Sequence, residues 1–368
     1  MQSRAYSARR VLTSVSCCAL LLLVSACCES SNTEGLPNAK LFEEGPLILY
    51  TTYGQYVELD TTDADPPELH AGIDIGACPD GKTRVLALEE GYVVKSTFES
   101  LEQYPANYTR HYVIISRGDD RSHGILYAHL ADTPFHEREK VTRGAYIGSV
   151  VNWETSGFDH LHVQLVSRYD SGLGTAEVWA SGEARDDGNP LLEFGSCFED
   201  DDPPTVEEVS SANGPVAFEF FKLNGETLPA AGLNGTVVIV ARLHDQCGAN
   251  TPLECMRSSP PDVIASQVVA PLSFLLSVRC TSDVGVAEQV FSLDLKRDVR
   301  DKLITNVYHS GSIGSYCERS LRFNLTYDPS NGCAWTPAKT GAAYELVLTV
   351  EDAAGLKTIL PPFAVTVL

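Results

Sequence analysis

Apolar and polar residues alternate over short stretches of this chain, which is the pattern of half-buried β-strands. These stretches are rich in β-branched and aromatic residues, and glycine, proline and aspartate separate them. In the first half, the predicted strands are 47–51, 84–88, 91–96, 112–116, 125–130 and 160–167. The pattern predicts a β-rich domain over residues 41–198.

The second half predicts a further set of strands at irregular spacing. They are residues 235–242, 273–278, 289–295, 321–327, 344–351 and 363–368. Such a pattern is typical of a β-sandwich, and residues 344–355 resemble the last hairpin of an immunoglobulin-like module. We therefore predict an all-β fold class, with an immunoglobulin-like β-sandwich over residues 205–368.

Two segments interrupt the strand pattern. Residues 199–204 read Glu-Asp-Asp-Asp-Pro-Pro, and like charges beside two prolines resist both helix and sheet. This acidic, proline-containing segment is the predicted linker between the two domains. Residues 27–40 are rich in Ser, Asn, Thr and Gly, which predicts a flexible tether before the first domain.

The N-terminus has the features of an export signal. Three arginines in the first ten residues precede an apolar stretch at 11–24, and Val-Ser-Ala-Cys follows at 24–27. This arrangement resembles a bacterial lipoprotein signal, which implies cleavage after Ala26 and acylation of Cys27. The alternative is a membrane-spanning helix, but the apolar stretch is shorter than the ~20 residues that a bilayer needs. We expect a signal peptide at 1–26 and an exported protein that is lipid-anchored to the cell envelope, on the periplasmic or surface side of the outer membrane. Whether Cys28 directs the protein to that membrane is left open by the sequence.

Composition narrows the set of partners. The 368 residues include 49 acidic and 27 basic ones, for a net charge of −22. Nucleic acid is excluded as a partner because phosphate binding needs a basic surface. Membrane contact is expected through the lipid anchor alone.

Eight of the 11 cysteines remain after the signal is removed and Cys27 is acylated. They are Cys28, Cys78, Cys197, Cys247, Cys255, Cys280, Cys317 and Cys333. An even number in an exported protein favours disulfides, although spacing does not give the pairing. A cysteine zinc site is the alternative, but the chain has no Cys-x-x-Cys pair.

Histidines are concentrated in the first domain, with seven of nine between residues 70 and 162. His160 and His162 are two apart in a predicted strand, so they share one face. His70 and Asp74 are four apart, and a straight strand would separate their Cα atoms by about 13 Å. We expect Gly72 to bend the chain so that both can reach one ion.

Three motifs follow one another in this region: His70-Ala-Gly-Ile-Asp74, Tyr127-Ala-His129-Leu, and His160-Leu-His162. Together they resemble the LytM or lysostaphin-type zinc metallopeptidases over residues 41–195. The resemblance implies that His70, Asp74 and His162 bind Zn²⁺ and that His129 and His160 are catalytic.

The residue types agree with this chemistry. Two imidazoles and a carboxylate leave a fourth position on zinc for water, whose pKa the metal lowers to roughly 7. His129 and His160 could deprotonate the water, stabilise the oxyanion or protonate the leaving amine, and their division of labour stays open. Tyr53 and Tyr127 could contact substrate, although packing is the expected role of Tyr127.

The three histidines outside the motifs, His111, His123 and His136, are interpreted as surface or loop residues. The resemblance and the export signal imply a zinc-dependent endopeptidase that cleaves peptide bonds of peptidoglycan. The alternative is a non-catalytic lipoprotein that binds the cell wall or regulates another hydrolase. The second domain shows no chemical site in its sequence, so its partner is left open.

Overall fold

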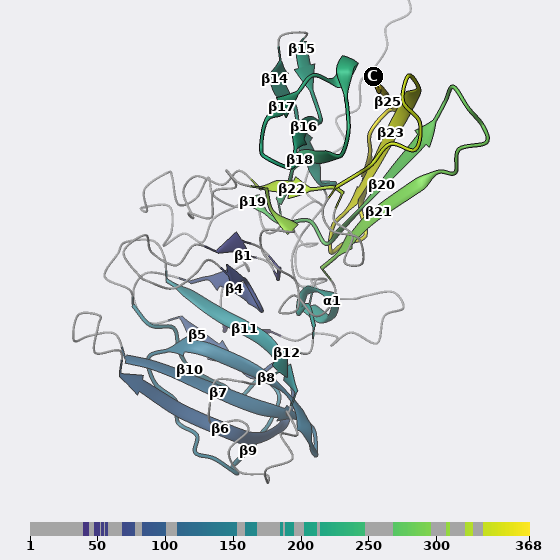
Figure 1. The fold of residues 1–368 in the computed structure, drawn as a ribbon. Helices are drawn as coiled ribbons and strands as arrows, with labels where there is room; N and C mark the ends of the chain where they lie inside the picture. Colours follow the sequence, from purple (N-terminus) through teal and green to yellow (C-terminus); the bar gives the residue numbers. More distant parts are fainter. Residues whose placement is uncertain are drawn as a thin grey trace, which may run out of the picture.

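The protein is nearly all β in a computed structural model (Figure 1). The structure describes residues 40–43, 48–51, 53–54, 56–57, 68–77, 83–100, 109–152, 159–167, 185–186, 188–194, 202–211, 214–246, 268–295, 307–309, 321–326 and 334–368. The predicted signal peptide, Cys27 and nearly all of the tether lie outside these ranges. In the described ranges, no helix has the length and apolar character needed to cross a membrane.

One antiparallel sheet dominates the N-terminal half. In spatial order its strands are β1 (Ile48–Thr51), β4 (Ile73–Gly76), β11 (His160–Ser167), β8 (Asp120–Leu130), β7 (Thr109–Arg117), β6 (Gly91–Ser100) and β9 (Lys140–Val141), and β12 (Arg185–Asp186) also pairs with β11. Two small sheets accompany it. They pair β5 (Arg84–Leu86) with β10 (Tyr146–Ser149) and β2 (Tyr56–Val57) with β3 (Glu68–Leu69).

The alternation in β11 gives this sheet two different faces. Leu161, Val163 and Leu165 enter the hydrophobic core of the N-terminal half. Cross-strand neighbours share a face, so Ile73 of β4 and Tyr127 of β8, both opposite Val163, lie in the same core. The histidines of β11 therefore lie on the other face, as the sequence pattern predicts.

The C-terminal half consists of two larger sheets and a small hairpin. In the first sheet β18 (Val237–Gln246) pairs with β13 (Thr205–Glu207), β16 (Glu219–Lys222), β19 (Val268–Val269) and β22 (Arg322–Asn324), and β17 (Thr227–Leu228) pairs with β16. The second sheet has the order β21 (Gln289–Asp294), β20 (Ser273–Cys280), β23 (Ala343–Glu351) and β24 (Lys357–Ile359), and β25 (Phe363–Thr366) also pairs with β23. The hairpin joins β14 (Val209–Ser211) and β15 (Gly214–Val216).

Both C-terminal sheets contribute to one core. Phe220 and Ile239 enter it from the first sheet, and Leu276 and Leu348 enter it from the second. The helical elements in the described residues are short: α1 (Leu191–Phe194) and the 3₁₀ helix η2 (Ala230–Gly232). Two sheets over a shared core confirm the all-β class, whereas the immunoglobulin-like topology stays a prediction.

Each predicted strand overlaps an observed one, although the ends differ. β11 has the predicted bounds. β6, β7 and β8 are longer than predicted because their backbone hydrogen bonding continues through polar residues at their ends. β22 is shorter than the predicted 321–327. Many of the short strands, such as β9 and β12, were not predicted because two residues carry no periodic signal.

Cys280 is the one cysteine that the described ranges contain. It is buried in β20 as a free thiol. The disulfide expected at Cys280 is therefore absent. The other seven cysteines of the predicted set lie outside the described ranges, so disulfides among them stay a prediction.

Candidate metal and catalytic site

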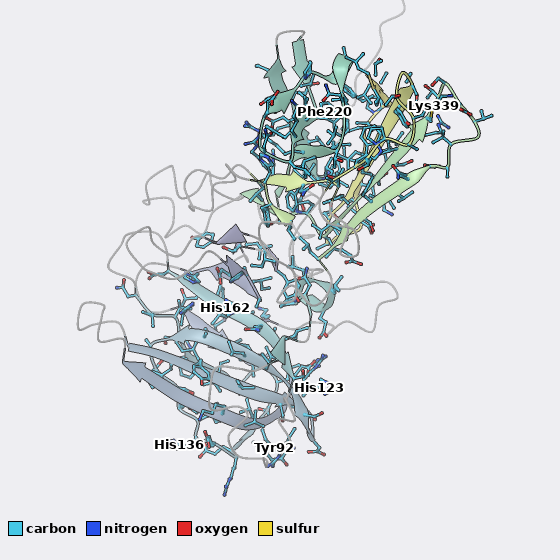
Figure 2. All side chains as sticks on the ribbon, viewed as in Figure 1. Tyr92, His123, His136, His162, Phe220 and Lys339 are labelled. Atoms are coloured by element: carbon cyan, nitrogen blue, oxygen red, sulfur yellow. The ribbon has the colours of Figure 1, made fainter. Side chains whose placement is uncertain are left out.

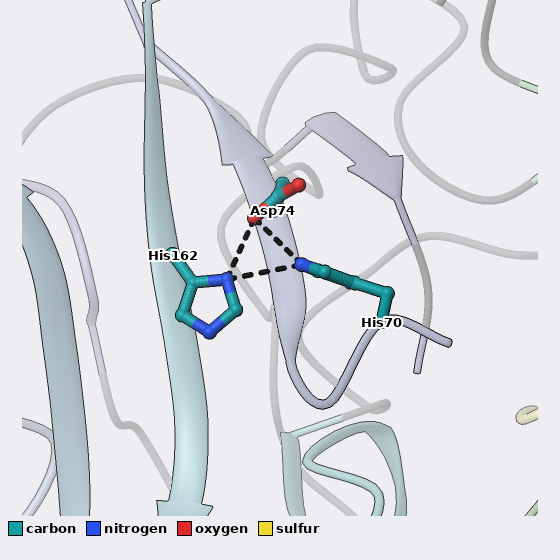
Figure 3. Close-up of side chains that lie close together, drawn as sticks. All are labelled: His70, Asp74 and His162. Atoms are coloured by element: carbon teal, nitrogen blue, oxygen red, sulfur yellow. Dashed lines mark hydrogen bonds and ion pairs between the residues drawn. The ribbon is translucent and has the colours of Figure 1, made fainter. Parts of the chain in front are cut away.

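His70, Asp74 and His162 converge on the polar face of the N-terminal sheet (Figure 3). Asp74 Oδ1 lies 3.2 Å from His70 Nε2 and 3.0 Å from His162 Nδ1. The two imidazole nitrogens are 3.0 Å apart. Residues separated by up to 92 positions in the chain thus present one atom each to a common point.

Strand register explains why Asp74 and His162 meet. They are direct cross-strand neighbours in the antiparallel pair of β4 and β11. Side chains in such a pair project from the same face at adjacent positions. Ile73 and Ile75 on either side of Asp74 are fully buried in the core, which turns the carboxylate to the opposite face.

His70 reaches the same point because the chain bends before β4 begins at Ile73. A Cβ atom on Gly72 would lie 2.7 Å from ring atoms of His162 and 2.6 Å from the carbonyl oxygen of Val163. Only glycine therefore lets the chain pass this close to β11. The expected bend at Gly72 is present, and it is also where the backbone packs against a ligand side chain.

The surroundings of Asp74 favour its ionised form. Burial alone would raise the pKa of this carboxyl, but the imidazoles of His70 and His160 and hydrogen bonds from His162 and His70 hold its pKa well below its usual range. Asp74 is 2% exposed, and His70 and His162 are partly exposed. The site thus combines the buried carboxylate of Asp74 with the partly exposed imidazoles of His70 and His162.

This donor set fits a four-coordinate zinc ion. Zinc–nitrogen bonds of about 2.0–2.1 Å at tetrahedral angles place two ligand atoms about 3.3 Å apart. The three observed separations are 3.0, 3.0 and 3.2 Å. Two imidazoles and a carboxylate are also the donors of catalytic zinc sites, which keep one position for a further ligand.

His129 and His160 lie together beside this cluster. Their ring centroids are 4.6 Å apart, and His129 lies 6.0 Å from the ring of His162. His160 Nε2 lies 3.9 Å from Asp74 Oδ1. All five residues that the sequence motifs single out are therefore brought to one site.

An irregularity in β8 is what brings His129 there. Opposite β7, Val113 pairs with Tyr127 and His111 pairs with Leu130, so β8 has one more residue than β7 between these pairs. Tyr127 and Leu130 are both buried in the core, and His129 has a left-handed backbone with φ of 64°. The bulge and this conformation turn His129 to the polar face, whereas regular alternation would have aimed it at the core beside Tyr127.

Two of the three histidines outside the motifs lie away from the site. His123 and His136 are exposed, and Figure 2 shows both far from His162. His111 is half-buried on β7, so it is neither a loop residue nor fully at the surface.

The two tyrosines considered as substrate contacts are both buried. The hydroxyl of Tyr127 accepts a hydrogen bond from the Leu88 N–H at 3.0 Å, which is the packing role expected of it. Tyr53 is 1% exposed and belongs to the hydrophobic core of the C-terminal half, so the expected substrate contact is wrong for this residue.

Sequence reasoning missed Thr51. In the register of β1 and β4 this residue pairs with Asp74, which places its side chain next to the carboxylate. Its hydroxyl is buried and has no hydrogen-bond partner among the residues that the structure describes. No local signal marks a threonine 23 positions before Asp74, because only strand pairing brings the two together.

Comparison with known proteins agrees with the site. The sequence model of peptidase family M23 matches residues 68–172, a range that contains all five site residues. No curated protein matches the chain.

Several solved structures are similar to part of this chain, at low TM-scores. The catalytic domain of the prophage-encoded M23 protein EnpA from Enterococcus faecalis is 21% identical, with 34% of this chain and 83% of that chain covered and a TM-score of 0.25. The catalytic domain of lysostaphin from Staphylococcus simulans is 20% identical, with 38% and 86% covered and a TM-score of 0.25. A zinc-containing peptidase from Vibrio cholerae is 17% identical, with 35% and only 37% covered and a TM-score of 0.25.

The family match and the site geometry lead to the same result. The three sequence motifs fall inside the matched range, and the structure joins them at one point on the sheet. The resemblance to LytM and lysostaphin-type peptidases is confirmed over residues 68–172, which match the sequence model of peptidase family M23.

Proposed function

We propose that this protein is a zinc-dependent endopeptidase that hydrolyses peptide bonds of peptidoglycan. The observation that carries the proposal is the convergence of His70, Asp74 and His162, with the His129–His160 pair at the edge of the cluster. Zinc held by the three ligands would supply a Lewis acid and a bound water of lowered pKa. Peptidoglycan as substrate rests on the family resemblance and on the predicted export signal.

The residues of the chain have separable tasks in this proposal. Asp74 and the two ligand histidines hold the ion, and the low pKa of Asp74 keeps its charge available at neutral pH. In this proposal His129 and His160, whose ring centroids are 4.6 Å apart, would share two tasks: accepting a proton from the attacking water and donating one to the departing amine. A protonated imidazole here would also stabilise the oxyanion that forms at the carbonyl.

The test is mass analysis of fragments released from purified peptidoglycan. Wild-type protein holding one zinc per chain is compared with a chelator-treated sample and with His129→Ala. The matched control is His136→Ala, which removes an exposed loop histidine of the same domain. We expect release of peptide fragments by wild type and His136→Ala only. Zinc-loaded wild type that releases nothing would overturn the peptidase proposal in favour of wall binding or regulation.

We also propose that the protein is exported and anchored by acyl chains on Cys27, on the outer membrane. The support is the signal-like pattern of residues 1–27 and the acidic composition. Mass analysis of the N-terminal peptide from the native membrane fraction tests this, with Cys27→Ser as the comparison. An unmodified Cys27, or an uncleaved N-terminus, contradicts the proposal.

A further inference from the structure

The metal ligand His70 lies at the contact between the two halves of the molecule. Leu69, the residue before it, is buried in the hydrophobic core of the C-terminal half. Tyr53 enters the same core from the N-terminal half. In Figure 1, β1 of the first sheet lies beside β19 of the C-terminal half. His70 is therefore held next to a residue that packs in the other half.

A chain of two hydrogen bonds links the His70 backbone to the C-terminal half. The Gly54 N–H donates to the His70 carbonyl oxygen at 2.7 Å. The Gly54 carbonyl oxygen accepts from the Tyr308 hydroxyl at 3.0 Å, in a buried environment. Gly54 has φ of 77°, a conformation that glycine adopts without strain. Both hydrogen bonds are made by the backbone of Gly54, which is thereby held between the His70 carbonyl and the Tyr308 hydroxyl.

A second contact fixes how the two halves meet. The Asn189 side-chain N–H donates to the Leu295 carbonyl oxygen at 3.2 Å, and its oxygen accepts from the Leu191 N–H at the start of α1. Ala353, in the turn between β23 and β24, packs against the core of the N-terminal half. The two halves thus contact one another here as well as at Gly54 and Tyr308.

We infer that the C-terminal half positions the metal ligand His70, through the packing of Leu69 and the hydrogen-bond chain from Tyr308 to Gly54. This inference rests on the proposed zinc site. According to this inference, residues 205–368 help to orient a ligand of the metal centre. Tyr308 is a positioning residue and not a ligand. Groups that orient a metal ligand usually contribute about 10–100-fold to metal affinity. Tyr308 is linked to His70 only through the backbone of Gly54. We therefore expect its contribution to zinc affinity to be at the lower end of that range.

The test measures zinc affinity by competition with a chelator, on the whole protein. Tyr308→Phe removes the hydroxyl that binds Gly54. Its matched control is Tyr344→Phe, which also removes a hydroxyl bonded to backbone in the C-terminal half, at Lys339. We expect Tyr308→Phe to bind zinc roughly 10-fold more weakly than wild type. Tyr344→Phe should lower the thermal midpoint while leaving zinc affinity unchanged.

A second pair keeps the test decisive if Tyr308→Phe fails to fold. Leu69→Ala shortens the side chain next to His70, and Leu228→Ala does the same at a similarly buried position of the same core. Weaker zinc binding by Leu69→Ala alone supports the inference. The inference is overturned if Tyr308→Phe binds zinc as tightly as Tyr344→Phe and Leu69→Ala binds it as tightly as Leu228→Ala. Wild-type protein that binds no zinc instead overturns the proposed function, so the two failures are distinguishable.

Discussion

Strands β11 and β8 lie side by side and both bring histidines to the site, but they do so by different means. His160 and His162 follow the regular alternation of β11, with core residues between them. His129 reaches the same face only through a bulge in β8 and a left-handed backbone. The difference teaches that the position of His162, the proposed metal ligand on β11, follows from a local pattern. The position of His129, the proposed catalytic residue on β8, depends on an irregularity of the sheet.

The largest effect should separate His162 on β11 from His129 on β8 by function. His162→Ala removes a ligand from β11, so zinc affinity should fall by at least about 100-fold, more than loss of a ligand's hydrogen-bond partner usually causes. His129→Ala removes no ligand, so it should keep one zinc per chain while turnover falls roughly 10²–10⁴-fold. Elemental analysis with peptide-release rates measures both. Loss of zinc from His129→Ala would show that the assignment of separate roles to His162 and His129 is wrong.

A smaller effect is expected where β11 meets the bend before β4. Gly72→Ala places a methyl group 2.7 Å from the His162 ring, so the ring or the chain must shift. We expect a loss of about 1–3 kcal/mol in unfolding free energy, as for overpacked cores, together with weaker zinc binding.

Urea unfolding and chelator competition measure the two quantities for Gly72→Ala. Gly232→Ala is the control, because its new Cβ would meet no atom closer than 3.4 Å. If both variants bind zinc as wild type does, the close approach at Gly72 has no role in holding His162.

Glycine should have opposite effects on the two strands. At His129 the left-handed backbone costs any side chain about 1–2 kcal/mol, so His129→Gly should be more stable than His129→Ala by about that amount. At His162, within a regular strand, His162→Gly should be less stable than His162→Ala by about 0.5–1 kcal/mol. Urea unfolding of the metal-free proteins gives both differences. If the Gly variant is more stable than the Ala variant at both positions, or less stable at both, the proposed effect of the bulge on the His129 backbone is wrong.

The smallest effect concerns His111, which faces the bulge from β7. Burial lowers the pKa of its imidazole, and nearby Asp132 opposes this in part. The folded state therefore takes up a proton at lower pH than the unfolded chain, whose histidines titrate near 6.5. Stability should fall as pH drops below about 6.5, until the folded imidazole is protonated as well.

We expect His111→Gln to reduce the difference in thermal midpoint between pH 7.5 and pH 5.5 in metal-free protein. His136→Gln, at an exposed loop position, is the control and should keep the wild-type difference. An unchanged difference in His111→Gln would show that burial of this imidazole does not matter for folding.

Much of the site could be predicted because its residues belong to short sequence motifs. The alternation at His160 and His162, the bend at Gly72 and all five site residues follow from local spacing and from the family resemblance. Thr51 could not be found in this way, because its place next to Asp74 depends on the pairing of β1 with β4. The role of Tyr53 was mistaken because nothing local distinguishes a tyrosine at a groove from one buried between two halves.

The sequence alone determined the all-β class, the two faces of β11 and the residue types that can hold a metal, since these depend on periodicity and side-chain chemistry. Tertiary structure decided that His70, Asp74 and His162 converge, that the bulge turns His129, and that Tyr308 reaches the backbone beside His70. The physical reason is that strand register and the contact between the two halves join residues as many as 254 positions apart, and no local pattern encodes those pairings.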